Sequence, residues 1–303
     1  MKILLTGAAG MLASAVALEV ERSGHKVFGS FIQVVKSDIN LRLPDIQKVD
    51  VRVLDDVYGW IKSEKPDFIF HFAAETNVDL CEKSPEHAYR TNYIGTENVA
   101  LVCQKYEIPL LYISTGAVFN GTNCEPYLEF DIPEPRNVYG KSKLAGEITV
   151  QRLLKKYFVI RAGWMIGGWE IDKKFVYKIV KQLLEGKKEI FAVDDKFGSP
   201  TFTMDFAKNL LPLIKTERYG LYHMANKGGA SRFDIASKIV EFMDLNEKVR
   251  VNPVNSAEFP LPAPRPRSEM LRNYHLDLMG MNDMPYWEDA LKRYISDNVK
   301  AFS

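Results

Sequence analysis

The sequence predicts an α/β protein with a doubly wound parallel sheet, because three features of the chain agree. Short apolar runs alternate with longer amphipathic segments up to about Trp164. The runs are rich in Ile, Val, Leu and Phe with little polar alternation, which is typical of strands buried on both faces. A helix-length segment separates each run from the next, as the crossovers between parallel strands require.

The elements follow in this order along the chain. Gly24 ends the helix expected at residues 10–25, and Pro66 helps to end the helix expected at residues 55–66. Pro85 lies near the first turn of the helix expected at residues 84–108. We expect strands at residues 2–7, 26–31, 67–74, 109–115 and 158–164. We expect helices at residues 10–25, 55–66, 84–108 and 139–157.

Beyond Trp164 the alternation loosens into helices with short strands between them. The predicted helices are residues 173–186, 202–214, 231–243 and 286–297, and the predicted strands are residues 189–193 and 220–225. No glycine-serine linker separates the two halves. We therefore expect residues 1–163 to form the sheet domain, and residues 164–303 to form a smaller mixed α/β substrate-binding lobe packed on it in a single globule.

The composition is that of an ordinary globular protein with a self-sufficient core. Of 303 residues, 46% are hydrophobic and 26% are charged, and the formal net charge is +1. So small a net charge gives no overall attraction to nucleic acid or to an anionic membrane, and we expect neither as a partner. Any charged ligand has to be held by local groups.

The three cysteines, Cys81, Cys103 and Cys124, show no spacing typical of a metal site, and we predict no bound metal. His71 sits in an apolar strand and is expected to be a satisfied core residue. An odd, sparse set of cysteines fits a reducing compartment. The apolar run after Lys2 is too short for a signal peptide, and no segment is long enough to span a membrane, so we expect a cytoplasmic protein.

The segment "TGAAGMLA" follows the first strand and opens the first helix. Gly7 permits a tight turn, Gly10 lets a diphosphate approach the backbone, and the small Ala13 lets the helix pack on the strand. Unpaired N–H groups at the start of this helix attract negative charge. We therefore predict a Rossmann-type NAD(P) site, and its expected contacts here are Gly7, Gly10, Met11 and Leu12.

The end of the second strand indicates which cofactor binds. An acid there accepts a hydrogen bond from the ribose 2′-hydroxyl of NAD, whereas its absence beside a cation suits the 2′-phosphate of NADP. Ser30 stands where the acid would fall and Lys36 follows, which favours NADPH, while Asp38 leaves NADH open. We expect Asp50 and Val51 near the adenine, although an exposed acid at a strand end explains Asp50 equally well.

A tyrosine precedes a lysine by four residues at three places, so the spacing alone cannot identify a reactive pair. The pairs are Tyr58 with Lys62, Tyr139 with Lys143, and Tyr177 with Lys181. Only Tyr139 lies on the helix after the strand that ends in Ser114 and Thr115. Ligands of such sheets bind at the carboxyl ends of the strands, so Thr115, Tyr139 and Lys143 are placed to converge on one point.

These three side chains suit the reduction of a carbonyl. A phenol has a pKa of about 10, so it needs an adjacent cation such as Lys143 to exchange a proton readily at neutral pH. Tyr139 would give its proton to the developing alkoxide while a nicotinamide delivers a hydride to the carbon. Thr115 would donate a second hydrogen bond to that oxygen, and Lys143 would also hold the nicotinamide ribose.

Several segments, among them "TGAAGMLA", "HFAAETNVD", "ISTGAVFNGT", "NVYGKSKLAGE" and "RPRSEML", occur in the order seen in extended short-chain dehydrogenases/reductases. The chain resembles this family from Lys2 to about Tyr294, and within it the dTDP-4-dehydrorhamnose reductases. The resemblance implies NAD(P)H-dependent reduction of the 4-keto group of a nucleotide-linked 6-deoxyhexose. It places Thr115, Tyr139 and Lys143 at the catalytic positions.

The resemblance also assigns residues around these three. It implies cofactor contacts from Phe72, Ala73, Ala74 and Asn92, and substrate contacts from Thr115, Gly116 and Trp164. Arg265, beside Arg267, is of the type that clamps a diphosphate bidentately, and a solvated arginine on a proline-fixed loop is the open alternative.

Departures from the family pattern concern the substrate side. The family commonly reads Ser-Thr-Asp-Tyr-Val-Phe-Asp-Gly where this chain reads "STGAVFNG". Gly116 and Ala117 thus remove a carboxylate and an aromatic ring, and Asn120 replaces another acid. Glu75 stands where the family usually has a tyrosine. These changes leave open the identity of the sugar more than the type of reaction.

Two other functions stay open at this stage. A sugar-nucleotide epimerase would keep its cofactor bound and recycle the hydride. A regulatory subunit similar to the β subunit of methionine adenosyltransferase would keep the nucleotide site and serve a partner enzyme. The oligomeric state is also open, with a homodimer as one alternative.

Overall fold

The centre of the computed structural model, which describes residues 1–31, 46–169 and 174–299, is a sheet of seven strands. In spatial order they are β11 (Gly220–His223), β6 (Tyr157–Ala162), β5 (Leu110–Thr115), β4 (Phe68–His71), β1 (Lys2–Thr6), β2 (Lys26–Phe31) and β3 (Ile46–Lys48). Every neighbouring pair is parallel, so all the carboxyl ends lie along one edge. The predicted doubly wound fold is confirmed.

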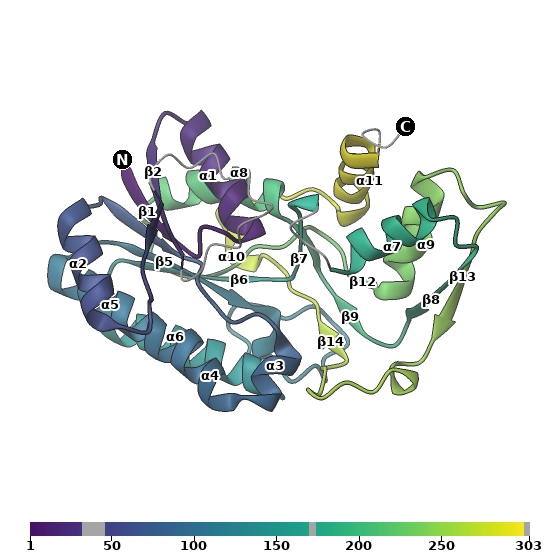
Figure 1. Ribbon diagram of the computed structural model, residues 1–303, viewed down its shortest axis with the longest axis horizontal. Helices are drawn as coiled ribbons and strands as arrows, with labels where there is room; N and C mark the ends of the chain where they lie inside the picture. Colours follow the sequence, from purple (N-terminus) through teal and green to yellow (C-terminus); the bar gives the residue numbers. More distant parts are fainter. Residues whose placement is uncertain (32–45, 170–173, 300–303) are drawn as a thin grey trace.

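Helices cover both faces of this sheet (Figure 1). One face carries α1 (Met11–Arg22) and α8 (Thr203–Lys215), which pack against each other. The other face carries α2 (Leu54–Glu64), α5 (Gly95–Tyr106) and α6 (Val138–Leu153). Buried apolar side chains form a separate cluster on each face, which explains why the strands are apolar on both sides.

The helix expected at residues 84–108 differs from the prediction in one respect. It is divided into α4 (Pro85–Tyr89), a π-helical turn η1 (Arg90–Ile94) and α5. Such π turns often lie at functional sites, and this one contains Asn92. The short helix α3 (Val78–Lys83), which the sequence analysis did not predict, begins where the side chain of Asn77 accepts a hydrogen bond from Leu80 N.

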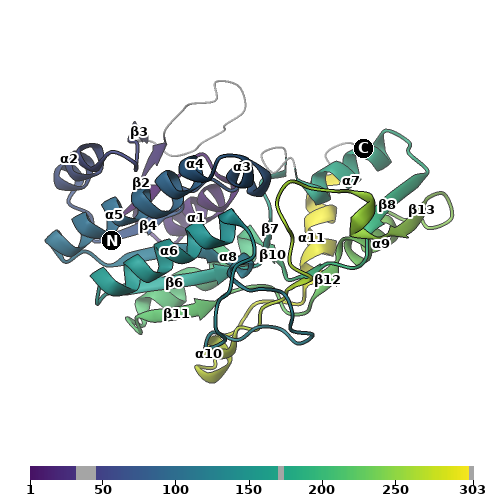
Figure 2. The same cartoon turned by 90° about the horizontal axis from the view of Figure 1, so that it is seen from below.

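The second part of the chain forms three small sheets beside the large one (Figure 2). The pairs are β7 (Trp164–Ile166) with β10 (Pro200–Phe202), β8 (Glu189–Val193) with β13 (Arg250–Val254), and β9 (Phe197–Gly198) with both β12 (Ala230–Ser231) and β14 (Ser268–Glu269). The predicted helices appear as α7 (Phe175–Leu184), α9 (Arg232–Phe242) and α11 (Trp287–Val299). Their apolar faces share one buried cluster.

Two elements that follow residue 164 in the sequence belong to the large sheet and its covering helices. Helix α8 covers the large sheet and β11 pairs with β6 at its edge. The division into two parts remains a proposal, and in it residues 203–223 belong with the first part. The boundary at residue 163 stays a prediction, and β11 joins the large sheet because an edge strand needs the hydrogen bonds of its neighbour wherever it lies in the sequence.

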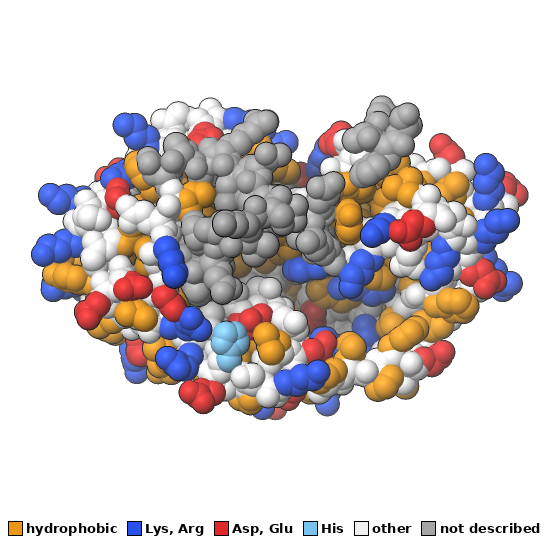
Figure 3. Space-filling model, viewed as in Figure 1, with side chains coloured by type: hydrophobic (Ala, Val, Ile, Leu, Met, Phe, Trp, Pro, Cys, Tyr) orange, Lys and Arg blue, Asp and Glu red, His pale blue; other side chains and the backbone are white. Residues whose placement is uncertain are grey.

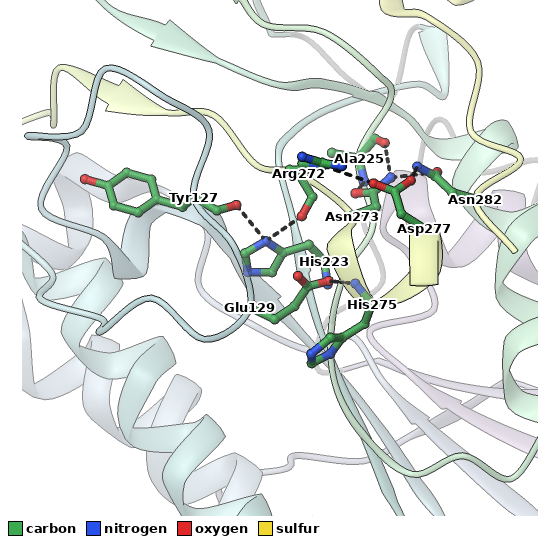
Figure 4. Close-up of polar contacts among 9 residues, drawn as sticks. All are labelled: Tyr127, Glu129, His223, Ala225, Arg272, Asn273, His275, Asp277 and Asn282. Atoms are coloured by element: carbon green, nitrogen blue, oxygen red, sulfur yellow. Dashed lines mark hydrogen bonds and ion pairs between the residues drawn. The ribbon is translucent and has the colours of Figure 1, made fainter. Parts of the chain in front are cut away.

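A polar cluster fastens the segment after β14 to the large sheet (Figure 4). Tyr127 O accepts a hydrogen bond from Arg272 N at 2.9 Å, and His223 Nδ1 lies 3.2 Å from the carbonyl oxygens of both residues. Burial lowers the pKa of His223 to about 3, so the neutral ring donates from Nδ1. Glu129 Oε1 accepts from the backbone N–H groups of His223 and His275. These bonds fix the segment of residues 270–273, which leads from β14 to helix α10 (Tyr274–Leu278).

None of the helices within the described ranges combines the length and apolar character needed to cross a membrane.

Candidate active site

A cavity of about 890 Å³ lies at the carboxyl ends of the central strands, between the sheet and the second part. The surface is hollowed between these two parts in Figure 3. Most of the residues predicted for the site line this cavity: Gly7, Gly10, Met11, Leu12, Phe72, Ala74, Thr115, Tyr139, Lys143, Trp164 and Arg265. Residues from both halves of the sequence therefore meet in one place.

The glycine turn opens α1 toward the cavity. Gly7 has a φ of +71°, and a Cβ on it would lie 2.7 Å from the backbone nitrogen of Ala73. Gly10 N donates to Gly7 O at 3.0 Å, and within the described ranges no side-chain hydrogen bond caps the start of α1. Gly7 and Gly10 line the cavity, and the N–H groups at the start of a helix, which have no acceptor within the helix, fit a bound diphosphate there.

A chain of buried hydroxyls and one imidazole holds the end of β4 beside this turn. Thr96 Oγ1 donates to Asn92 O, so it accepts from His71 Nε2 at 3.0 Å. Thr6 Oγ1 lies 2.7 Å from His71 Nδ1 and accepts from the backbone N–H groups of Phe72 and Ala73. Burial lowers the pKa of His71 to about 3, so the ring is neutral and its directions of donation are fixed. The expectation of a satisfied core histidine is confirmed.

Helix α6 brings Tyr139 to the end of β5. Asn137 caps the helix by accepting from Gly140 N at 2.8 Å, and a side chain at residue 140 would collide with the carbonyl oxygen of Ala117. This close approach sets the phenol of Tyr139 beside the hydroxyl of Thr115. Burial raises the pKa of Tyr139, while the hydrogen bond with Thr115 lowers it. The phenol therefore stays protonated at neutral pH.

Lys143 lies one turn further along α6, buried behind Tyr139. Its Nζ is 4.2 Å from the centre of the Tyr112 ring, where the π electrons attract the cation. Burial nevertheless lowers the pKa of Lys143 to about 7, and the charge of Glu147 opposes this shift. The adjacent cation expected from the sequence is therefore charged below about pH 7 and neutral above it.

The two other Tyr-Lys pairs lie elsewhere. Tyr58 with Lys62 is on α2, and Tyr177 with Lys181 is on α7. None of these four side chains lines the cavity. Position at the sheet edge therefore distinguishes the pair on α6 from pairs with the same spacing.

Asn92 is buried behind the cavity and ties three segments together. Its Oδ1 accepts from Glu75 N at 2.8 Å, and its Nδ2 donates to Glu75 O and to Ser142 Oγ. Ser142 Oγ in turn donates to Tyr139 O. Asn92 is thus placed to position α6 and the loop after β4, and direct contact with a cofactor stays a prediction.

Three residues predicted to contact the adenosine half of the cofactor lie outside the cavity lining. Ser30 is buried in β2, and Val51 packs beneath Gly95. Asp50 follows β3 instead of ending it, and its carboxylate accepts from Arg52 Nη2 at 2.6 Å. The hydrogen bonds from Arg52 lower the pKa of Asp50.

Ala73 and Gly116 also lie outside the lining, and both approach other backbone closely. Lys36 and Asp38, on which the choice between NADPH and NADH partly depended, lie outside the described residues.

The structure gives Arg265 a protein partner. Its Nη2 lies 3.0 Å from Asp79 Oδ1 on α3, and its Nη1 donates to Ala263 O. Ala263 N also donates to Asp79 Oδ1. Arg265 thus links the second part to the first across the cavity mouth, and a clamp on a diphosphate stays a prediction.

One acidic residue of the cavity is not predicted by the sequence motifs. Glu269, on β14, accepts a hydrogen bond from Trp164 Nε1 at 2.6 Å. The guanidinium carbon of Arg232 lies 3.9 Å from the centre of the Trp164 ring. The segment "RPRSEML" contains this acid, but nothing in its local pattern indicates that β14 reaches the strand ends of the large sheet.

The family model described as "RmlD substrate binding domain" matches residues 1–299. The chain belongs to this RmlD family. The spore coat polysaccharide biosynthesis protein SpsK of Bacillus subtilis is 32% identical over 99% of this chain and 99% of SpsK. The dTDP-4-dehydrorhamnose reductase of Mycolicibacterium smegmatis is 32% identical over 99% of this chain and 86% of the relative.

Solved structures agree with this membership of the RmlD family. A crystal structure of dTDP-4-dehydrorhamnose reductase from Bacillus anthracis, in complex with NADP, superimposes with a TM-score of 0.87 at 35% identity. It covers 98% of this chain and 99% of its own. The resemblance inferred from the sequence motifs is confirmed.

Proposed function

We propose that this protein is an NADPH-dependent reductase of the 4-keto group of a nucleotide-linked 6-deoxyhexose. The observation that carries the proposal is the convergence of Thr115, Tyr139 and Lys143 with the glycine turn in one cavity. The relatives named dTDP-4-dehydrorhamnose reductase support the same substrate class.

The cofactor would be held by the backbone around the first turn of α1 and by the end of β4. Gly7, Gly10, Met11 and Leu12 line the side of the cavity where the N–H groups of α1 meet the diphosphate. When bound, NADPH supplies the hydride. The preference for NADPH is supported by Ser30 in place of an acid on β2 and by the NADP in the structure from Bacillus anthracis, and NADH stays the alternative.

The residues of this chain handle the proton. Tyr139 is protonated and gives its phenolic proton to the carbonyl oxygen as that oxygen becomes an alkoxide, which leaves an alcohol and a phenolate. Thr115 donates a hydrogen bond to the same oxygen. The side chain of Lys143, when protonated, stabilises the phenolate, and it would hold the nicotinamide ribose.

Replacing Gly7 with alanine should destabilise the fold and weaken NADPH binding. The left-handed φ costs an alanine about 1–2 kcal/mol, and at Gly7 the new Cβ also meets the backbone of Ala73. Gly24 is a matched control, because its φ is +73° but a Cβ added there would have nothing within 4 Å. Urea unfolding should show a larger loss of unfolding free energy for Gly7→Ala than for Gly24→Ala. Equal losses would contradict the close approach of Gly7 to the backbone of Ala73.

The activity should fall as the pH rises through about 7. Because burial lowers the pKa of Lys143 from 10.5 to about 7, the ammonium is present below this pH and is lost above it. The quantity to measure is kcat/KM between pH 5.5 and 9, since it reports ionisations of the free enzyme. Circular dichroism at each pH checks that the fold persists. A profile that stays level up to pH 9 would exclude Lys143 as the controlling group.

The function is tested by following NADPH and NADH absorbance with a panel of nucleotide 4-keto-6-deoxysugars. Stoichiometric loss of reduced cofactor with formation of the alcohol supports reduction. A new sugar without net loss of cofactor indicates an epimerase. Tight cofactor binding without any turnover indicates a regulatory subunit, an alternative that the loss of the acid at Gly116 keeps open. The cytoplasmic location and the homodimer stay predictions.

A further inference from the structure

One acidic side chain of the cavity, Glu269, has no role in the proposed proton transfer. Glu269 lines the same cavity as Thr115 and Tyr139, and after burial its charge is the largest of the effects that raise the pKa of Tyr139. Residue 269 also lies beside the end of β5, because a Cβ on Gly116, the residue after Thr115, would lie 2.9 Å from the carbonyl oxygen of Glu269.

The position of this carboxyl group is built by its neighbours. Trp164 Nε1 donates to Glu269 Oε2 at 2.6 Å, and Arg232 stacks on the indole, with its guanidinium carbon 3.9 Å from the ring centre. Among the residues that the structure describes, hydrogen bonds reach only Oε2 of the two carboxylate oxygens. Oε1 can therefore accept a hydrogen bond from a ligand.

Gly116 explains how β14 reaches the reacting groups. A Cβ on Gly116 would lie 2.9 Å from the carbonyl oxygen of Glu269, so any side chain at residue 116 would push β14 away. The polar cluster of Figure 4 holds the segment after β14 against the sheet. The missing carboxylate at residue 116 and the presence of Glu269 are thus two parts of one arrangement, in which the acid comes from the opposite wall.

We propose that Glu269 is a specificity-determining residue that accepts a hydrogen bond from the sugar hydroxyl beside the reacting carbonyl. This inference rests on the proposed function. In a 4-keto-6-deoxyhexose the ketone has a single hydroxyl neighbour, on C3, because C5 carries the methyl group. A carboxylate only accepts hydrogen bonds, so it recognises this donor and disfavours a substrate without it.

Charge near the carboxyl group is consistent with the acceptor role. Burial raises the pKa of Glu269, while the hydrogen bond from Trp164 and the charges of Arg232 and Arg265 lower it. Burial has the largest effect, so the pKa of Glu269 lies above its usual value, and these three groups act against that shift in favour of the ionised form that accepts from a hydroxyl.

The test combines a protein variant with a substrate variant. Glu269→Gln keeps the size of the side chain, and the 3-deoxy analogue of dTDP-4-dehydrorhamnose removes the hydroxyl. Each change alone should lower kcat/KM by about tenfold to a hundredfold, the usual effect of losing a hydrogen bond to a charged group. Together they should cost little more than either alone, because both remove the same interaction. Equal losses for the variant on both substrates, or no loss on either, would overturn the inference.

Binding provides a readout without turnover. Calorimetric titration with dTDP-rhamnose should show at least about tenfold weaker binding to Glu269→Gln, with NADPH affinity unchanged. Glu185→Gln is the matched control, since this glutamate on the surface beside α7 is 61% exposed. If the wild-type protein reduces no sugar nucleotide, the proposed function fails. If it reduces dTDP-4-dehydrorhamnose and Glu269→Gln matches it in both measurements, only the inference fails.

Discussion

Tyr139→Phe should lower kcat for reduction of dTDP-4-dehydrorhamnose by a factor on the order of 10²–10⁴, the usual contribution of a positioned general acid. The substitution removes one oxygen atom and its proton and leaves the ring in place. The affinity for NADPH should be unchanged, because the glycine turn and the end of β4 that line the cofactor side do not depend on this hydroxyl. Stopped-flow absorbance and cofactor fluorescence measure the two quantities separately.

Tyr58→Phe is the matched control for this experiment. Tyr58 also precedes a lysine by four residues on a helix, but it lies on α2, outside the cavity. Its replacement should leave kcat unchanged. A Tyr139→Phe protein that turns over at the rate of wild type would remove the proposed proton donor and with it the mechanism.

Glu147→Gln should lower the free energy of unfolding by about 3–5 kcal/mol, the usual cost of breaking a buried ion pair from one side. Glu147 on α6 and Arg161 on β6 have side chains only 1% and 3% exposed, and Arg161 Nη2 donates to Glu147 Oε2 at 2.8 Å. Arg161 Nε donates to the same carboxylate. Without that carboxylate the guanidinium remains buried and uncompensated. Urea titration at neutral pH measures the loss.

Glu97→Gln provides the comparison, because it breaks an ion pair between α5 and α6 on the same face of the sheet. Arg152 Nη2 lies 3.4 Å from Glu97 Oε1, and the side chain of Arg152 is 64% exposed. Water replaces this interaction, so the loss should be at most about 1 kcal/mol. If Glu147→Gln and Glu97→Gln lower the free energy of unfolding equally, burial does not determine how much the Glu147–Arg161 ion pair contributes to stability.

Glu147→Gln should also move the falling limb of the pH profile to lower pH. Burial lowers the pKa of Lys143, and the charge of Glu147 opposes that shift. Without this charge the ammonium is lost at a lower pH. The profile of kcat/KM measures the change, and an unmoved limb would show that Glu147 does not act on Lys143.

Much of the site was predictable because its first half is made of contiguous motifs. The turn at Gly7 and Gly10, the strand that ends in Thr115 and the helix with Tyr139 and Lys143 each follow from residues next to one another. Parallel strands have to place their carboxyl ends at one edge, so these motifs meet in the cavity. The three Tyr-Lys pairs show the limit of such reasoning, since position in the sheet, and not spacing, separates them.

Other features depended on contacts that are distant in the sequence. The pairing of β11 with β6, the ion pair of Arg265 with Asp79 and the hydrogen bond of Trp164 with Glu269 all join separate segments. Their local patterns are those of an ordinary strand, a surface arginine and a surface acid. Nothing in them states which partner they meet.

By itself the sequence determined the doubly wound sheet, the glycine turn and the identity of the proposed proton donor, because periodicity and turn chemistry act between near neighbours. Only the tertiary structure decided that β14 crosses to the strand ends and that Glu269 lines the same cavity as Thr115 and Tyr139. It also decided that burial lowers the pKa of Lys143 to about 7. Burial and contacts between segments distant in the sequence set these properties, and both depend on how the whole chain packs.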